Sequence, residues 1–224
     1  MICIFMPSIL SQNQIKILTL LSGEKSVTDI FYLSGGTVLA EFYLQHRLSE
    51  DLDFFSEHEF NPMFISAILK KIKEKGGILK INYEQSFNRN LYFLELKNDN
   101  IKTEFTYFPF TRIESQKKFG DLYIDSLIDI AVNKLFTIYQ KPRSRDFIDL
   151  YFILMKEKSW NIDDLIKKSQ IKFDTHINPI QLSGQFVKAE TLKDYPRMVK
   201  DIDEKEWQGF FVKEARRLAE LSME

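Results

Sequence analysis

Residues 35–55, GGTVLAEFYLQHRLSEDLDFF, constrain the fold of this chain more than any other stretch. A glycine pair opens the stretch, a helix is predicted over 37–46, and a short strand is predicted over 51–56. Side chains alternate along a strand, so Leu52 and Phe54 share one face while the aspartates beside them share the other. The stretch therefore predicts a glycine turn, a helix, and a strand with one apolar and one charged face.

The first half of the chain mixes helical and strand-like segments. Apolar residues recur at helical spacing over 9–22, and Asn61-Pro62 opens a helix that runs to about Lys75. The mixture predicts an α+β fold, with a mixed sheet that contains at least one hairpin and is flanked by helices. Further strand-like runs cover 28–34 (or the end of the first helical unit), 78–84, 90–97 and 101–109.

After about residue 112 the pattern becomes helical. Helices are predicted over 125–140, 145–157, 161–170 and 203–221, and 171–200 is predicted to be irregular because Pro179, Gly184 and Pro196 interrupt it. We place a soft boundary near residue 115, with a core over 1–115 and a helical C-terminal lobe over 116–224. No Gly/Ser linker separates the halves, so we expect the lobe to pack on the core.

Composition limits the kind of protein. The 224 residues and 44% hydrophobic content support one large packed domain, or a smaller one with a helical extension. Charge is balanced, with 31 Lys+Arg against 32 Asp+Glu, so nucleic-acid contact would need a local basic patch. The single cysteine, Cys3, excludes a disulfide framework and a cysteine zinc site, and it indicates the cytoplasm. No apolar run is long enough for a membrane span, and no signal peptide is recognisable.

Asp51 and Asp53 are candidate metal ligands. On one face of a strand they would lie roughly 6–7 Å apart and repel each other, and a divalent cation relieves that repulsion. Mg²⁺ suits the pair because it binds a few carboxylate oxygens together with substrate phosphates. Glu104, the one carboxylate within the strand-like 101–108, is the candidate third ligand. The alternative is that the aspartates cap a turn or lie in solvent.

The glycine turn is a candidate phosphate site. Gly35 and Gly36 let the backbone approach an anion closely, Thr37 adds a hydroxyl, and the helix start aims free N–H groups at a phosphate. The pattern is neither a Walker A loop nor a dinucleotide fingerprint, and the alternative is a simple helix start. His46 and Arg47 end the predicted helix, where they either offset its dipole or contact substrate, and we take Arg47 as a nucleotide contact.

A second set of candidates follows in the C-terminal half. Lys134 falls in the apolar stripe of the helix 125–140, so it must snorkel, pair with a carboxylate or contact a phosphate. Asp146 and Asp149 share a face of the next helix, where Asp149 has Arg145 as an alternative partner. The basic residues between these helices are the best candidate for contact with phosphate or an RNA backbone: Lys141, Arg143 and Arg145.

Residues 35–55, Lys134 and RDFIDLYFIL (145–154) together resemble the AbiEii/AbiGii toxin family of nucleotidyltransferases, in the DNA polymerase beta-like superfamily. The resemblance covers roughly residues 30–155 and implies a nucleotidyltransferase fold. It implies an NTP substrate, Mg²⁺ (or Mn²⁺) as cofactor, and an acceptor hydroxyl on RNA, such as tRNA, or on a protein. It also implies a toxin role beside a cognate antitoxin.

The resemblance carries roles over residue by residue. It makes Lys134 the nucleotide-contacting lysine and Asp146 the acidic residue of the last motif. One position departs from the superfamily, whose third carboxylate is usually Asp where this chain offers Glu104. The remaining matches are the phosphate-binding turn, Gly35, Gly36 and Thr37, and the metal ligands, Asp51 and Asp53.

Two other functions stay open at this point. The first is a degenerate, non-catalytic transferase that binds nucleotide or RNA and acts through a partner, and Glu104 in place of Asp favours it. The second is a metal-dependent glycosyltransferase, which also uses Asp-x-Asp. That motif normally follows a Rossmann-like half of about 100 residues, whereas about 50 residues precede it here, which counts against the second function.

Overall fold

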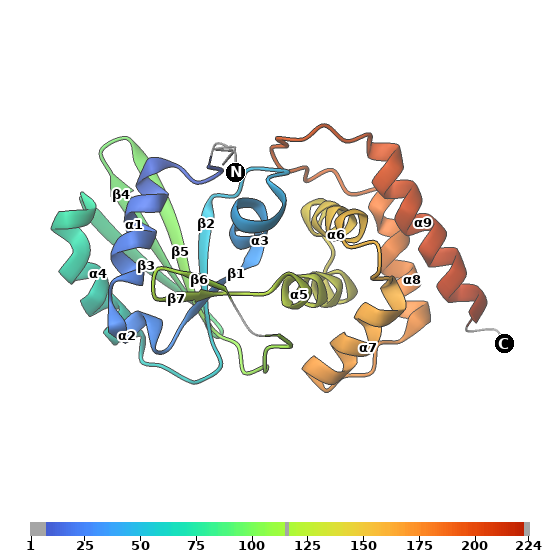
Figure 1. The fold of residues 1–224 in the computed structure, drawn as a ribbon, viewed down its shortest axis with the longest axis horizontal. Coiled ribbons are helices and arrows are strands. Elements are labelled where there is room, and N and C mark those ends of the chain that lie inside the picture. The colour runs from blue at the N-terminus through green and yellow to red at the C-terminus, as the bar shows by residue number, and fades with distance from the viewer. Residues whose placement is uncertain (1–7, 115–116, 222–224) are drawn as a thin grey trace, which may run out of the picture. The chain divides into compact units, whose positions relative to one another are not determined.

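The structure is a computed structural model that describes residues 8–114 and 117–221, and it divides into two compact units (Figure 1). Unit 1 comprises Met1–Thr111 with Ser115–Asp125, and unit 2 comprises Arg112–Glu114 with Ser126–Glu224. The predicted boundary near residue 115 falls on residues that, like Cys3, lie outside the described ones.

Unit 1 contains a seven-stranded mixed sheet with the strand order β3-β4-β5-β2-β1-β7-β6. The pairs β2–β5 and β1–β7 are parallel, and the other neighbouring strands are antiparallel. The predicted α+β fold with a mixed sheet is therefore confirmed. The strands are β1 Tyr32–Ser34, β2 Asp51–Ser56, β3 Lys80–Ser86, β4 Arg89–Leu96, β5 Asp99–Tyr107, β6 Lys117–Phe119 and β7 Leu122–Ile124. The helical segments are α1 Gln12–Ser22, α2 Lys25–Thr28, α3 Gly35–Val38, η1 Leu39–Leu44 and α4 Pro62–Gly76.

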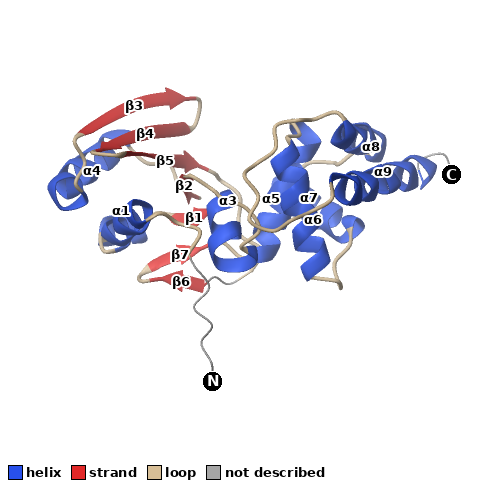
Figure 2. Cartoon of the chain, turned by 90° about the horizontal axis from the view of Figure 1, so that it is seen from above, coloured by secondary structure: helices blue, strands red, loops and turns tan. Residues whose placement is uncertain are grey.

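The apolar face of the sheet packs under two helices. Leu52 and Phe54 of β2 are fully buried, and the Phe54 ring stacks on Phe105 of β5 with 4.7 Å between centroids. Figure 2 shows α1 and α4 on the same side of the sheet, with α3 on the other side. Burial of each large apolar side chain contributes about 1.5–3 kcal/mol to the stability of the fold. Because this energy would be lost if Leu52 and Phe54 faced solvent, the alternation leaves the opposite face of β2 for the charged side chains.

The start and end of α4 follow from its sequence. The Asn61 side chain accepts a hydrogen bond from the Met63 amide, Pro62 occupies the first turn, and the helix ends at Gly77 with a φ of 72°. These are the N-cap, proline and left-handed C-cap signals that define a helix by local chemistry.

Unit 2 is helical and packs around a cluster of aromatic rings. Phe147 lies at its centre, with ring centroids 4.8 Å from Phe211, 6.2 Å from Trp207 and 6.3 Å from Phe186. The predicted helical C-terminal region is confirmed. Its helices are α5 Leu127–Gln140, α6 Ser144–Lys156, α7 Ile162–Phe173, α8 Pro179–Val187, the 3₁₀ segment η2 Lys188–Glu190 and α9 Glu204–Leu221.

Two sequence predictions were wrong in detail, and one element was missed. Residues 171–200 were predicted to be irregular but contain α8, which Asn178 caps through two amide hydrogen bonds before Pro179. The helix predicted over 37–46 begins at Gly35, becomes a π-helix and ends before the left-handed Gln45, whose φ is 49°. The short hairpin of β6 and β7 was not predicted, because strands of three residues are too short to show alternation.

Candidate active site

The glycine turn joins β1 to α3, and both of its glycines are required by close approach. Gly35 has a φ of 77°, and a Cβ on it would collide with the carboxylate of Asp53. A Cβ on Gly36 would collide with the guanidinium of Arg47. In the antiparallel β1–β2 pair, Ser34 lies opposite Asp53, so the turn places the carboxylate against the Gly35 backbone.

Thr37 holds the turn to the start of β2. Its side chain is fully buried, and its hydroxyl lies 2.8 Å from the Ser49 hydroxyl and donates to the carbonyl oxygen of Asp51. The Gln14 amide of α1 donates to the Glu50 carbonyl at 2.9 Å, so the same loop is held from a second side. Thr37 thus positions β2, and its predicted contact with phosphate stays a prediction.

The carboxylates lie on two neighbouring parallel strands. In the β2–β5 register, Asp51 is opposite Lys102 and Asp53 is opposite Glu104. Lys102 Nζ is 2.7 Å from Asp51 Oδ2, and both side chains are partly exposed. Glu104 therefore lies on a strand beside the one that carries the aspartates. Asp51 pairs with Lys102, and Glu104 pairs with a different cation.

Arg89 of β4 clamps Glu104. Its Nε lies 2.6 Å from Oε1 and its second guanidinium nitrogen 2.5 Å from Oε2, while the Thr106 hydroxyl donates to Oε1 at 2.8 Å. Burial disfavours the charged carboxylate, but the hydrogen bonds from Arg89 and Thr106 outweigh burial and hold the pKa of Glu104 below its ordinary value. The pKa of Arg89 is raised in turn, first by Glu104 and then by the charges of Asp53 and Asp51.

Asp51, Asp53 and Glu104 are not equally suited to bind a divalent metal ion. No group of three or more Asp, Glu, His or Cys side chains among residues 8–114 and 117–221 is arranged to hold a metal ion. Asp51 and Asp53 form a two-carboxylate pair on one strand face, which suits Mg²⁺ with its remaining positions taken by water and phosphate. Both oxygens of Glu104 are engaged by Arg89, so Glu104 is the weaker donor.

Lys134 is held by two buried aspartates in unit 2. Its Nζ lies 2.7 Å from Asp146 Oδ1 and 2.6 Å from Asp149 Oδ2. Arg143 Nε is 2.8 Å from Asp146 Oδ2. Burial opposes the charge on Asp146, but Lys134 and Arg143 outweigh it and lower its pKa. An ammonium has three donors, and Lys134 uses two of them on these carboxylates.

The alternative pairing of Asp149 with Arg145 was wrong, because packing of α5 against α6 brings Lys134 to Asp149. Arg47 is buried, and its guanidinium lies beside Gly36. One guanidinium nitrogen of Arg47 is 2.9 Å from the Leu48 carbonyl oxygen. The predicted nucleotide contacts of Arg47 and Lys134 and the catalytic role of Asp146 stay predictions. Arg89 was not predicted, because its partner is 15 residues away and only the hairpin register aligns them.

A glycine turn, a helix and an acidic strand on a mixed sheet define the nucleotidyltransferase class of fold. JHP933 from Helicobacter pylori has a similar structure, with 19% identity, a TM-score of 0.56 and coverage of 94% of each chain. A second H. pylori structure, described as a candidate nucleotidyltransferase, has the same identity and TM-score and covers 94% of this chain and 96% of that one.

Sequence comparison narrows the class. The family described as "Nucleotidyl transferase AbiEii toxin, Type IV TA system" matches residues 19–216. The chain belongs to this family. The Aquifex aeolicus protein aq_aa25, described as uncharacterized, is 33% identical over 147 residues, which span 64% of this chain and 66% of that protein.

The predicted family resemblance is therefore confirmed, and the match extends beyond 30–155 into the C-terminal helices. The description of the matched family names nucleotidyl transfer as the family's activity. Among the described residues no helix is both long and apolar enough to cross a membrane.

Proposed function

We propose that the protein transfers a nucleotide from an NTP to an acceptor hydroxyl, with Asp51 and Asp53 holding a divalent ion, Mg²⁺ or Mn²⁺. The observation that carries the proposal is the contact between Asp53 and Gly35, which places a carboxylate against the turn that would receive the triphosphate. Asp51 and Asp53 would hold the ion beside this turn, where it would neutralise charge on the triphosphate.

The proposed reaction is an in-line displacement at the α-phosphorus. The acceptor oxygen forms a bond to that phosphorus, the bond to the β-phosphate bridging oxygen breaks, pyrophosphate leaves and the acceptor proton passes to solvent. The bound ion would supply charge neutralisation at the triphosphate. Arg89 favours the ionised form of Glu104 by lowering its pKa, Lys102 pairs with Asp51, and Gly35 leaves room for Asp53.

The proposed role as the toxin of a toxin–antitoxin system rests on the family match rather than on the geometry of the site. We propose that the chain is a cytoplasmic toxin whose activity a cognate antitoxin counters, and that its acceptor is RNA, such as a tRNA 3′ end, or a protein hydroxyl. Growth arrest on expression, lost together with transfer in Asp53→Asn, would support this role. Arrest that persists in a transfer-deficient Asp53→Asn chain would separate toxicity from the enzyme.

The test is incubation of the purified chain with each α-labelled NTP, Mg²⁺ and total bacterial RNA. We expect Asp53→Asn to lower transfer at least about 100-fold, because loss of a metal ligand removes several kcal/mol of transition-state stabilisation. Asp121→Asn is the matched control, since this exposed aspartate lies in the same unit. Equal transfer by parent and Asp53→Asn would contradict the proposal.

A second candidate is a non-catalytic nucleotide- or RNA-binding module. The Arg89–Glu104 clamp favours it, because both oxygens of the third carboxylate are engaged. NTP binding without pyrophosphate release, across all four NTPs and a tRNA pool, would support this second candidate over the first.

A further inference from the structure

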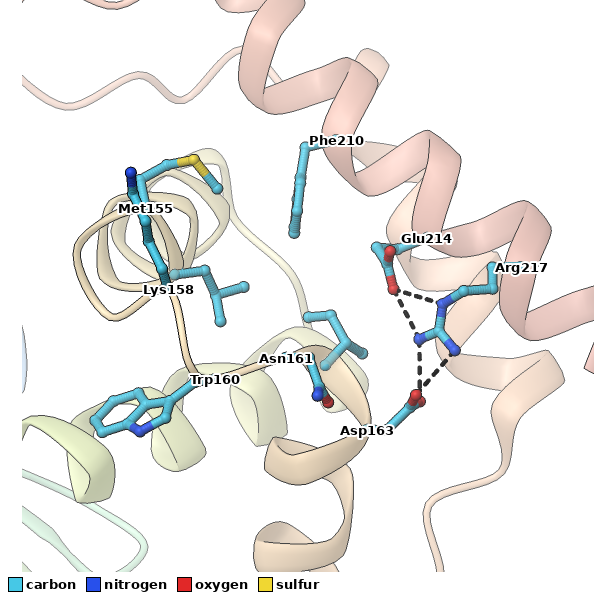
Figure 3. Close-up of a pocket in the computed structure, with 10 residues that line it drawn as sticks. Met155, Lys158, Trp160, Asn161, Asp163, Phe210, Glu214 and Arg217 are labelled. Carbon is cyan, nitrogen blue, oxygen red and sulfur yellow. Dashed lines mark hydrogen bonds and ion pairs between the residues drawn. The ribbon is translucent and has the colours of Figure 1, made fainter.

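Unit 2 contains a pocket that shares no residue with the candidate active site. It lies among the end of α6, the α6–α7 loop, the start of α7 and the middle of α9, and its volume is about 540 Å³ (Figure 3). Pockets of 300–1,000 Å³ are typical of small-ligand sites. Leu154 and Ile162 are buried and give the pocket an apolar floor, and Met155 is partly exposed beside them.

Two aromatic side chains line the pocket, and neither is stacked on another ring of the described chain. Phe210 of α9 makes only edge-to-face contacts, with Tyr151 at 5.7 Å and with Phe211 at 5.1 Å. Trp160, in the α6–α7 loop, contacts no other ring among the described residues. Aromatic faces that line a pocket without a stacking partner suit a flat, π-faced ligand.

The charged side chains that line the pocket are an acidic cluster on one wall and one separate lysine. Arg217 pairs with Asp163 at 2.9 and 3.0 Å and with Glu214 at 2.8 Å, so this wall holds two carboxylates against one guanidinium and is acidic (Figure 3). Lys158 forms no ion pair with any residue the structure describes. Two aromatic side chains beside a lysine that forms no ion pair match a ligand that is flat and uncharged at the end away from the lysine and anionic at the end near it.

We propose that this pocket binds a nucleobase, with Phe210 stacking on the base and Lys158 contacting its phosphate. The Asn161 side chain lines the pocket, and its oxygen accepts the hydrogen bond that caps α7, which leaves its amide N–H groups as donors for a base edge. The inference rests on the proposed function, since a transferase that acts on a strand must hold that strand. A protein side chain could fill the apolar floor, but it would not account for the uncompensated Lys158.

The base comes from one of two sources, a free nucleotide or a single-stranded RNA, and the test separates them. Fluorescence anisotropy of a labelled eight-nucleotide RNA, and calorimetry with the four nucleoside monophosphates, are measured in EDTA without NTP. We expect Phe210→Ala and Met155→Glu each to weaken binding about tenfold, because base–aromatic stacking is lost or the pocket is charged. Lys158→Ala is expected to lower the slope of log affinity against log salt by about 0.7.

Ile171→Ala is the matched control, because Ile171 lies on α7, is 83% exposed and does not line the pocket. Monophosphates that bind as tightly as the RNA would identify a free nucleotide as the ligand, and tighter RNA binding would identify the strand. Absence of binding by both probes, or equal binding by Phe210→Ala and Ile171→Ala, would overturn the proposal and leave a protein side chain as occupant.

Base binding by the pocket and nucleotide transfer by the candidate active site can be tested separately. Asp53→Asn is expected to bind the RNA within about twofold of the parent, because Asp53 lies in the other unit. Transfer activity with normal RNA binding by Phe210→Ala would refute only the pocket. Pocket-dependent binding without transfer by the parent chain would refute only the proposed function.

Discussion

Gly35→Ala tests the geometry of the candidate active site directly. Gly35 has a φ of 77°, and an added Cβ would meet the Asp53 carboxylate. The backbone term costs about 1–2 kcal/mol, because L-residues are disfavoured in the left-handed region. Displacement of Asp53 from its rotamer adds about 0.5–1.5 kcal/mol. We therefore expect urea unfolding to show a loss of about 1.5–3.5 kcal/mol, with loss of nucleotide transfer.

Gly77→Ala is the control that isolates the contact with Asp53. Gly77 has a similar φ of 72°, but an added Cβ would meet nothing nearer than Lys16 Nζ at 3.6 Å. Its substitution should cost the backbone term alone and leave transfer intact. In an Asp53→Ala background, Gly35→Ala should cost no more than Gly77→Ala. Equal costs for the two glycines in the parent chain would refute the reasoning.

Three further predictions concern stability. Lys134→Ala should cost about 3–5 kcal/mol in urea unfolding, because it removes the one cation that lies between two buried carboxylates, and a loss below 1 kcal/mol would contradict this. Burial opposes ionisation of Asp129, but the ion pair with Lys172 outweighs burial and lowers the pKa of Asp129. The stability that this group contributes is therefore present above its unfolded pKa of about 3.9 and is lost as pH falls through its folded pKa. Asp129→Asn should flatten the acid side of a profile of Tm against pH. Phe87 is 96% exposed with a φ of 53°, so Phe87→Asn should raise the unfolding free energy, and a decrease would show that the ring contributes to stability.

The sequence predicts an element best where its local chemistry is complete. Asn61-Pro62 and Gly77 specify α4, and the alternation around Leu52 specifies β2 with its acidic face. The same Asn-Pro signal is present before α8, but Pro179 was interpreted as a breaker rather than as a first-turn residue. Local signals must therefore be read together with their position in an element.

Partners of charged side chains could not be predicted, because they depend on register and packing. Arg89 reaches Glu104 only through the pairing of β4 with β5, and Lys134 reaches Asp149 only because α5 packs on α6. Neither pairing leaves a signal within a short window of sequence. The type and strand position of the acidic residues were predictable, and the cations that compensate them were not.

The central claim is nucleotidyl transfer at the acidic strand, and a comparison of two labels in one NTP tests it most directly. Parallel reactions with α-labelled and γ-labelled NTP distinguish transfer of the nucleotide from transfer of the terminal phosphate. We predict that the α label enters RNA or protein, that the γ label is released as pyrophosphate, and that Asp53→Asn loses both signals while Asp121→Asn keeps them. Incorporation of the γ label, or an α signal unaffected by Asp53→Asn, would contradict the account.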